Sequence, residues 1–319
     1  MVAFASVKRY GSVLVVAAIV AVVVASPISS DVEDAQFPLS NLLSSSLEGD
    51  FLVDSSILSA LARFDDPVEA LLALKPELEA MMAEPRLIRV FGDGSQDGIW
   101  MTEGDKLRLR REGKGFMDLT ESQDQDWLGD SFVAGKPNLP NITHQAFIRP
   151  IFKDLKTSNM YDVLKHATSY YNRYYFAETG VESSRWLHDH IASIIANSPL
   201  KTYISLEVHT HRFPQPSIIA RFEPPVRDAS LPLTIIGAHQ DSANYLFPLL
   251  PAPGADDDMS GSTSILEAFR ALAGRGYIPE NGPVEFHWYA AEEAGLLGSQ
   301  EIVAYKKGLG AKVGAMMEF

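Results

Sequence analysis

The chain has 319 residues, of which 46% are hydrophobic and 21% are charged, as is usual for globular proteins. This composition excludes disorder across the whole chain and a fibrous repeat. The formal net charge of −14 argues against a protein that binds nucleic acid or an anionic membrane by charge alone. Cysteine is absent, so any metal ion must be held by histidine and carboxylate side chains.

The first residues have the pattern of a secretory signal peptide. Lys8 and Arg9 precede an uncharged run, residues 13–25, that is rich in Val and Ala and ends in small residues. A signal anchor is the alternative, but the run is shorter than the roughly 20 residues that span a bilayer. We therefore expect a signal peptide over residues 1–25, and a secreted, extracellular protein that is not held in the membrane.

The next part of the chain, residues 26–142, differs in composition from residues 143–319. It starts acidic and Ser-rich, shows helical periodicity between about residues 58 and 78, and becomes polar over residues 121–142. The sequon at Asn141 is an N-glycosylation acceptor in a secretory protein, so we expect a glycoprotein. We predict that this region ends in a linker, and that residues 143–319 form a packed domain.

Helices and short apolar strands alternate in the second part of the chain. This order predicts an α/β fold, with a sheet sandwiched by helices. The expected helices cover residues 158–178, 182–197, 260–273 and 299–307, and the expected strands cover residues 203–208, 217–222, 233–237 and 284–290.

Three acidic or histidine-containing clusters follow predicted strands or loops. In the first, G-A-H-Q-D-S, His239 and Asp241 are two residues apart and point the same way in extended backbone. In the second, A-P-G-A-D-D-D, three consecutive carboxylates at residues 256–258 repel one another, and a divalent cation relieves that repulsion. Taken alone, such a run is more often the acidic start of a helix.

The third cluster contains the adjacent glutamates Glu292 and Glu293 at the end of another apolar strand. Adjacent side chains point in different directions, so one can bind a metal ion while the other faces a bound water. A pair of glutamates alone is usually a surface feature. Together, however, the three clusters supply one His, a candidate bridging carboxylate and a Glu pair, which is typical of zinc hydrolases.

The motifs G-A-H-Q-D-S, A-P-G-A-D-D-D and A-A-E-E-A-G-L-L-G-S-Q resemble those of the secreted two-zinc aminopeptidases, peptidase family M twenty-eight. The resemblance covers roughly residues 86–319 and is greatest to the fungal leucine-aminopeptidase-like branch. It implies the zinc-exopeptidase fold, a mixed sheet sandwiched by helices. It also implies two zinc ions, peptide substrates with a free N-terminus, a monomer, and an N-terminal propeptide within residues 26–142.

The resemblance also implies a role for each site residue. His239 would bind one zinc ion, Glu293 the other, and Asp257 would bridge both. Asp241 would orient the His239 imidazole, and Glu292 would act as general base and acid.

The family pattern includes two further ligands, an Asp soon after the strand that follows Glu293 and a His much later. Neither is found before Phe319. We therefore expect a C-terminally truncated fold, and weak or no activity from the chain as written.

Two other functions remain open from the sequence: a catalytically inactive relative acting as a binding protein, and a zinc hydrolase of the same fold with another substrate. Two further histidine pairs are present, His209 with His211 on a predicted strand and His188 with His190 on a predicted helix. The first pair has a spacing that can bind metal, but we expect both pairs to be structural or at the surface. We expect His287 to lie in the core.

Overall fold

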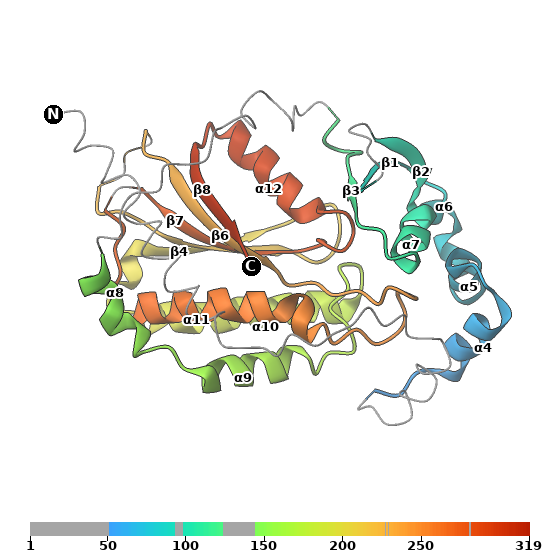
Figure 1. Ribbon diagram of the computed structural model, residues 1–319, viewed down its shortest axis with the longest axis horizontal. Coiled ribbons are helices and arrows are strands. Elements are labelled where there is room, and N and C mark those ends of the chain that lie inside the picture. Colours follow the sequence, from blue (N-terminus) through green and yellow to red (C-terminus); the bar gives the residue numbers. More distant parts are fainter. Residues whose placement is uncertain (1–50, 93–97, 124–143, 227, 229, 281) are drawn as a thin grey trace.

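The computed structural model describes residues 51–319 except 93–97, 124–143, 227, 229 and 281 (Figure 1). The predicted signal peptide and the sequon at Asn141 lie outside the described residues. Among the described helices, none is both long enough and apolar enough to cross a membrane.

A five-stranded mixed sheet forms the centre of the larger part of the molecule. Its strand order is β4-β5-β7-β6-β8. Strand β7 pairs antiparallel with β5 and parallel with β6, and β8 pairs parallel with β6. The strands are β4 (Ile204–His209), β5 (Ser217–Phe222), β6 (Leu233–His239), β7 (Val284–Tyr289) and β8 (Val313–Glu318).

Helices cover both faces of this sheet. Figure 1 shows α12 on one face and α10 and α11 on the other, with α9 packed outside them. The helices are α8 (Gln145–Phe152), α9 (Thr157–Ala167), α10 (Glu178–Ala196), α11 (Gly261–Gly274) and α12 (Leu297–Gly308). Every residue of β6 and β7 is buried, as expected for central strands with helices on both sides. The predicted α/β fold with a mixed, helix-covered sheet is therefore confirmed.

The main core lies between the sheet and α11. Phe269 of α11 packs edge-on against Phe286 and Trp288 of β7, and Phe222 of β5 joins the same cluster. These large rings are wholly buried. Their burial fixes the height of α11 above the sheet, and with it the position of the irregular turn that precedes α11.

One predicted helix was too long. We expected a helix over residues 158–178, but α9 ends at Ala167 and turns follow until α10 begins at Glu178. In this interval the buried Arg173 guanidinium donates hydrogen bonds to the carbonyls of Gln240 (2.8 Å) and Gly254 (2.9 Å). These bonds to distant loops hold the backbone in a non-helical path that local periodicity does not reveal.

The described part of residues 51–123 forms a smaller unit. It contains a three-stranded antiparallel sheet in the order β2-β1-β3. Its elements are α4 (Ser55–Arg63), α5 (Pro67–Leu74), α6 (Glu79–Met82), β1 (Pro85–Val90), β2 (Ile99–Thr102), α7 (Glu103–Arg111) and β3 (Phe116–Asp118). The helices of this N-terminal unit share a hydrophobic cluster with Phe247 and Leu250 of the loop after β6. The unit therefore packs on the end of the sheet where that loop lies.

A buried ion-pair network lies on β7 beneath α12. The Glu285 carboxylate accepts hydrogen bonds from Lys306 Nζ (2.7 Å) and Arg221 Nη1 (2.8 Å), and lies 2.7 Å from His287 Nε2. Burial raises the pKa of Glu285, but its hydrogen bond to His287 and the charges of His287 and Lys306 outweigh burial and hold the pKa at about 2. His287 is wholly buried, which confirms its predicted place in the core.

We predict that Glu285→Gln destabilises the protein by about 3–5 kcal/mol at neutral pH, because it leaves the buried Lys306 charge without its partner. The folded-state pKa lies below the unfolded one, so the stabilisation exists above about pH 4.5 and is lost as the pH falls toward 2. Denaturant unfolding at several pH values measures this. The exposed Glu207→Gln is the control. A gap between Glu285→Gln and the unsubstituted protein that stays constant down to pH 2 would contradict the assignment.

Candidate functional site

Two parallel strands carry the predicted site residues to one edge of the sheet. His239 is the last residue of β6 and pairs in register with Tyr289, the last residue of β7. Glu292 and Glu293 follow β7 after a short turn. Because parallel strands end at the same edge, the first and third sequence clusters lie side by side.

The Asp241 carboxylate joins these two clusters. It is fully buried and accepts hydrogen bonds from the backbone N–H groups of Glu292 (3.0 Å) and Glu293 (3.2 Å). Its Oδ1 also lies 3.5 Å from His239 Nδ1, and the Asp241 carbonyl oxygen lies 3.2 Å from the same nitrogen. Asp241 can therefore orient the His239 imidazole, as the resemblance implies, and it also fixes the backbone of the glutamate pair.

The backbone leaves β7 sharply just before the glutamates. Ala291 has a φ of 55°, in the left-handed region that a residue with a Cβ rarely adopts. Ala290, before it, donates its N–H to Ser217 Oγ at 2.9 Å. This turn breaks the strand alternation, so that Glu292 and Glu293 both line the pocket described below.

The three consecutive aspartates lie in the irregular turn Ala255–Ser260, labelled η4, and have three different environments. Asp257 Oδ1 lies 2.9 Å from His239 Nε2, and Tyr245 donates its hydroxyl to Asp257 Oδ2 at 2.8 Å. Asp258 is buried and accepts from the backbone N–H groups of His239 and Gly261. Asp256 is exposed, and its carboxylate makes no hydrogen bond to the described residues. Of the three, Asp257 is the one aimed at the predicted metal ligand.

A pocket of about 370 Å³ lies at this edge of the sheet. His239, Tyr245, Asp257, Glu292 and Glu293 contribute one wall of this pocket. The opposite wall comes from the N-terminal unit: Phe91, Arg110, Gly113, Lys114, Gly115 and Phe116. The Asp257 side chain is 58% exposed and that of Glu292 is 37% exposed, so both carboxylates reach the open space of the pocket.

Negative charge accumulates in this pocket. Burial, together with the charges of Asp241, Asp257 and Glu292, raises the pKa of Glu293 to about 8, although the Arg110 charge opposes the rise. Burial also raises the pKa of Glu292. A bound cation would relieve this repulsion, which is the electrostatic condition of a metal site built from carboxylates.

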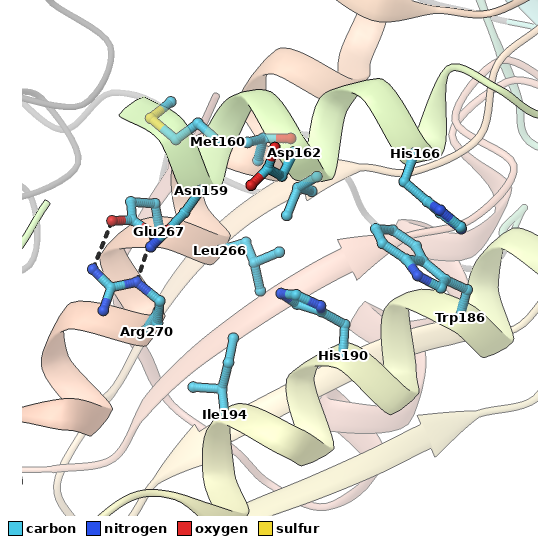
Figure 2. A pocket seen from close by; sticks show the side chains of 12 residues that line it. Asn159, Met160, Asp162, His166, Trp186, His190, Ile194, Leu266, Glu267 and Arg270 are labelled. Atoms are coloured by element: carbon cyan, nitrogen blue, oxygen red, sulfur yellow. Dashed lines mark hydrogen bonds and ion pairs between the residues drawn. The ribbon is translucent and has the colours of Figure 1, made fainter. Parts of the chain in front are cut away.

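A second cavity, of about 340 Å³, lies between α9, α10 and α11. In Figure 2, His166 of α9 stacks on Trp186 of α10, and His190 lies on the other side of the same ring. None of the predicted site residues lines this cavity. The His190 ring is packed against Trp186, as expected of a structural or surface histidine.

Residues 217–319 match the family described as Peptidase family M28. Over 231 residues the chain is 38% identical to "Leucine aminopeptidase 1" of Coccidioides posadasii, covering 70% of this chain and 58% of that protein. Over 225 residues it is 41% identical to "Leucine aminopeptidase 1" of Sclerotinia sclerotiorum, covering 69% and 57%. The predicted resemblance to peptidase family M28 is confirmed over this part of the chain. The chain spans about 58% of the length of the curated relatives that it matches.

Solved structures support the fold of this chain. The "LapA aminopeptidase" of Legionella pneumophila superposes with a TM-score of 0.59 at 26% identity, covering 76% of this chain and 66% of that chain. LapB of the same organism superposes with a TM-score of 0.57 at 24% identity, covering 77% and 67%. The predicted resemblance to the fungal leucine-aminopeptidase-like branch is confirmed by the named fungal relatives.

Three residues beside the candidate site were given no role from the sequence. Tyr245 holds Asp257 by its hydroxyl, and Arg110 places a positive charge near Glu293. Arg173 holds both ends of the loop between β6 and the aspartate turn, and burial lowers the pKa of its guanidinium to about 10. None of them lies within one of the three motifs, so only the folded arrangement connects them to the site.

We predict that Asp241→Asn lowers the affinity of the site for zinc about 10- to 100-fold, the usual effect of losing a group that orients metal ligands. An amide –NH₂ in place of one carboxylate oxygen faces the N–H of Glu292 or Glu293 instead of accepting from it. Zinc titration of the variant and of exposed Asp256→Asn measures the effect. Equal affinities of the two variants would show that Asp241 does not organise the site.

Proposed function

We propose that the protein is a secreted metallo-aminopeptidase that removes N-terminal residues from peptides with a centre of two zinc ions. One observation carries the proposal: His239, Asp257 and the Glu292–Glu293 pair, which are far apart in sequence, line a single pocket. The fungal relatives named leucine aminopeptidase support the peptidase reaction and the free N-terminus of the substrate.

The donor atoms present fit zinc, which binds imidazole nitrogen and carboxylate oxygen. We propose that His239 and Asp257 hold one ion, and that Asp257 and Glu293 hold the other. His239 and Asp257 already face each other, since Nε2 and Oδ1 lie 2.9 Å apart. When bound, zinc would acidify a water molecule and polarise the scissile carbonyl.

Glu292 is the residue that moves protons in this proposal. Its Oε2 lies 3.8 Å from His239 Nε2, beside the proposed ligands, and its side chain is partly open to the pocket. It would accept a proton from the attacking water and deliver it to the leaving amine. Tyr245 keeps Asp257 in place, and Asp241 keeps the backbone of both glutamates in place.

The charge of the pocket suits a substrate with a free α-amine. Asp257, Glu292 and Glu293 place carboxylates together, and these attract an ammonium group. We therefore propose peptides with a free N-terminus as substrates. The acidic chain argues against nucleic acid as a partner. We further propose that the protein is a monomer, and that removal of its signal peptide releases it from the membrane.

The N-terminal unit covers one side of this pocket. Its β3 is fixed to the peptidase part by the Asp118 N–H, which donates to the Gly295 carbonyl at 3.0 Å, and by Gln300 Nε2, which donates to the Asp118 carbonyl. We propose that residues 26–142 act as the propeptide and linker of the enzyme, and that residues 143–319 carry the peptidase fold.

We predict that Glu292→Gln retains zinc but lowers turnover about 10²- to 10⁴-fold, because it removes the general base and not a ligand. Release of a chromophore from a leucine derivative with a free amine, together with elemental analysis for zinc, measures both effects in a full-length version of the chain. Glu182→Gln, an exposed change on α10, is the control. Near-normal turnover with zinc retained would remove Glu292 from the mechanism.

We predict that Asp257→Asn loses most of the bound zinc, whereas Asp256→Asn retains it. The two substitutions remove the same charge from adjacent residues, but Asp257 alone of the pair contacts His239. Zinc stoichiometry after dialysis distinguishes them. If both variants keep their zinc, the proposed bridging role is wrong, and if both lose it, the effect is one of general charge.

A further inference from the structure

We propose a second, separate transition-metal site formed by His209, His211 and Glu301. Among the described residues, these form the group of three ligand-type side chains whose donor atoms all lie within 4.8 Å of one another. Two imidazoles and one carboxylate, with water as the fourth ligand, are a donor set that zinc adopts. None of the three lines the pocket that contains His239.

The three ligands come from the edge strand β4, the loop that follows it, and α12. His209 is the last residue of β4, His211 follows it in the loop to β5, and Glu301 lies in α12. His211 Nδ1 lies 2.7 Å from Glu301 Oε2, and the two imidazole rings are 5.0 Å apart between centroids. With bonds of about 2.0–2.2 Å to one ion, the Glu301 carboxylate would have to move away from His211 Nδ1, because the two atoms now lie closer together than two ligands of one ion.

His211 is already oriented as a metal-binding histidine. Its Nε2 lies 2.7 Å from Ser217 Oγ, so Nδ1 is the nitrogen that faces Glu301. The ring also stacks on Phe213, with centroids 4.6 Å apart and planes 17° apart. Histidines that bind metals normally use the second ring nitrogen in a hydrogen bond of this kind, which fixes the ring and its tautomer.

His209 supplies the adjustable ligand. Its ring contacts Tyr305 of α12 at 5.2 Å, and its ring nitrogens make no hydrogen bond within the part of the chain that the structure describes. It is partly exposed, as is Glu301, whose side chain is 27% exposed. An ion can therefore reach His209 and Glu301 from solvent. At the buried His211 side chain it would replace the present contact between Nδ1 and Glu301.

Occupation of this site would connect the β4–β5 loop to α12. It would also act on the turn before Glu292, since His211 contacts Ser217 Oγ, which accepts the Ala290 N–H. We infer that the ion stabilises this end of the sheet and holds the Ser217 contact to Ala290. The sequence suggested a structural or surface role for the histidine pair; the proposal adds Glu301, about ninety residues later, as the third ligand.

The test compares His209→Asn with His188→Asn, a partly exposed histidine of α10, in an Asp257→Ala background that removes the proposed bridging ligand of the other centre. Zn²⁺ binding is measured by calorimetry on the full chain. We expect one Zn²⁺ per chain in the His188→Asn protein, with a zinc-dependent rise in Tm, and the loss of both in the His209→Asn protein. Glu301→Ala should behave as His209→Asn does.

Cu²⁺ used as a spectroscopic probe gives a second readout. We expect electron paramagnetic resonance to show two coupled imidazole nitrogens in the control and one or none in His209→Asn. Identical zinc stoichiometry and identical copper spectra in the two proteins would overturn the proposal. The comparison does not depend on the proposed peptidase centre, because any ion retained there is present in both proteins.

Discussion

The buried Asp241 carboxylate holds together the ends of two parallel strands, and the candidate site depends on that connection. A buried carboxylate is costly unless its oxygens accept hydrogen bonds, and here two backbone N–H groups from the glutamate turn satisfy them. The buried Arg173 is also attracted to Asp241, and its guanidinium holds the loops that lead to the aspartate turn. The His, Asp and Glu segments are thereby fixed relative to one another by interactions beneath the pocket.

The N-terminal unit adds a constraint on access to this pocket. Arg110 places a positive charge opposite Glu293, and Phe91 and Phe116 add apolar surface to the same wall. Its attachment is extensive, since the helices share a hydrophobic cluster with the loop after β6 and the Asp118 N–H donates to the Gly295 carbonyl. A substrate can therefore reach the pocket only past this wall or after the N-terminal unit is displaced.

The sequence predicted the fold class and the approximate place of the site because both depend on short-range patterns. Apolar strands followed directly by His239 and by the glutamate pair are visible without a structure, and parallel pairing then puts their ends at one edge. The different roles of Asp256, Asp257 and Asp258 were not visible, because they depend on how one irregular turn directs each side chain. The helix predicted over residues 158–178 was too long for a similar reason. Tertiary hydrogen bonds of Arg173 determine the backbone conformation after α9.

The contacts that could not be predicted from the sequence were mainly those between segments far apart in the chain. Glu301 and His211 meet only because α12 packs beside the β4–β5 loop, and no local spacing connects them. Tyr245 likewise reaches Asp257 from a loop. Composition and periodicity report which residues are available, whereas the partners of a polar side chain are set by topology.

The most direct test of the central claim is a crystal structure of the protein soaked with Zn²⁺, with anomalous data collected on both sides of the zinc absorption edge. The account predicts an anomalous peak within about 2.0–2.2 Å of His239 Nε2 and of an Asp257 carboxylate oxygen, and a second peak beside Glu293. Strong peaks elsewhere, with none between His239 and Asp257, would contradict it.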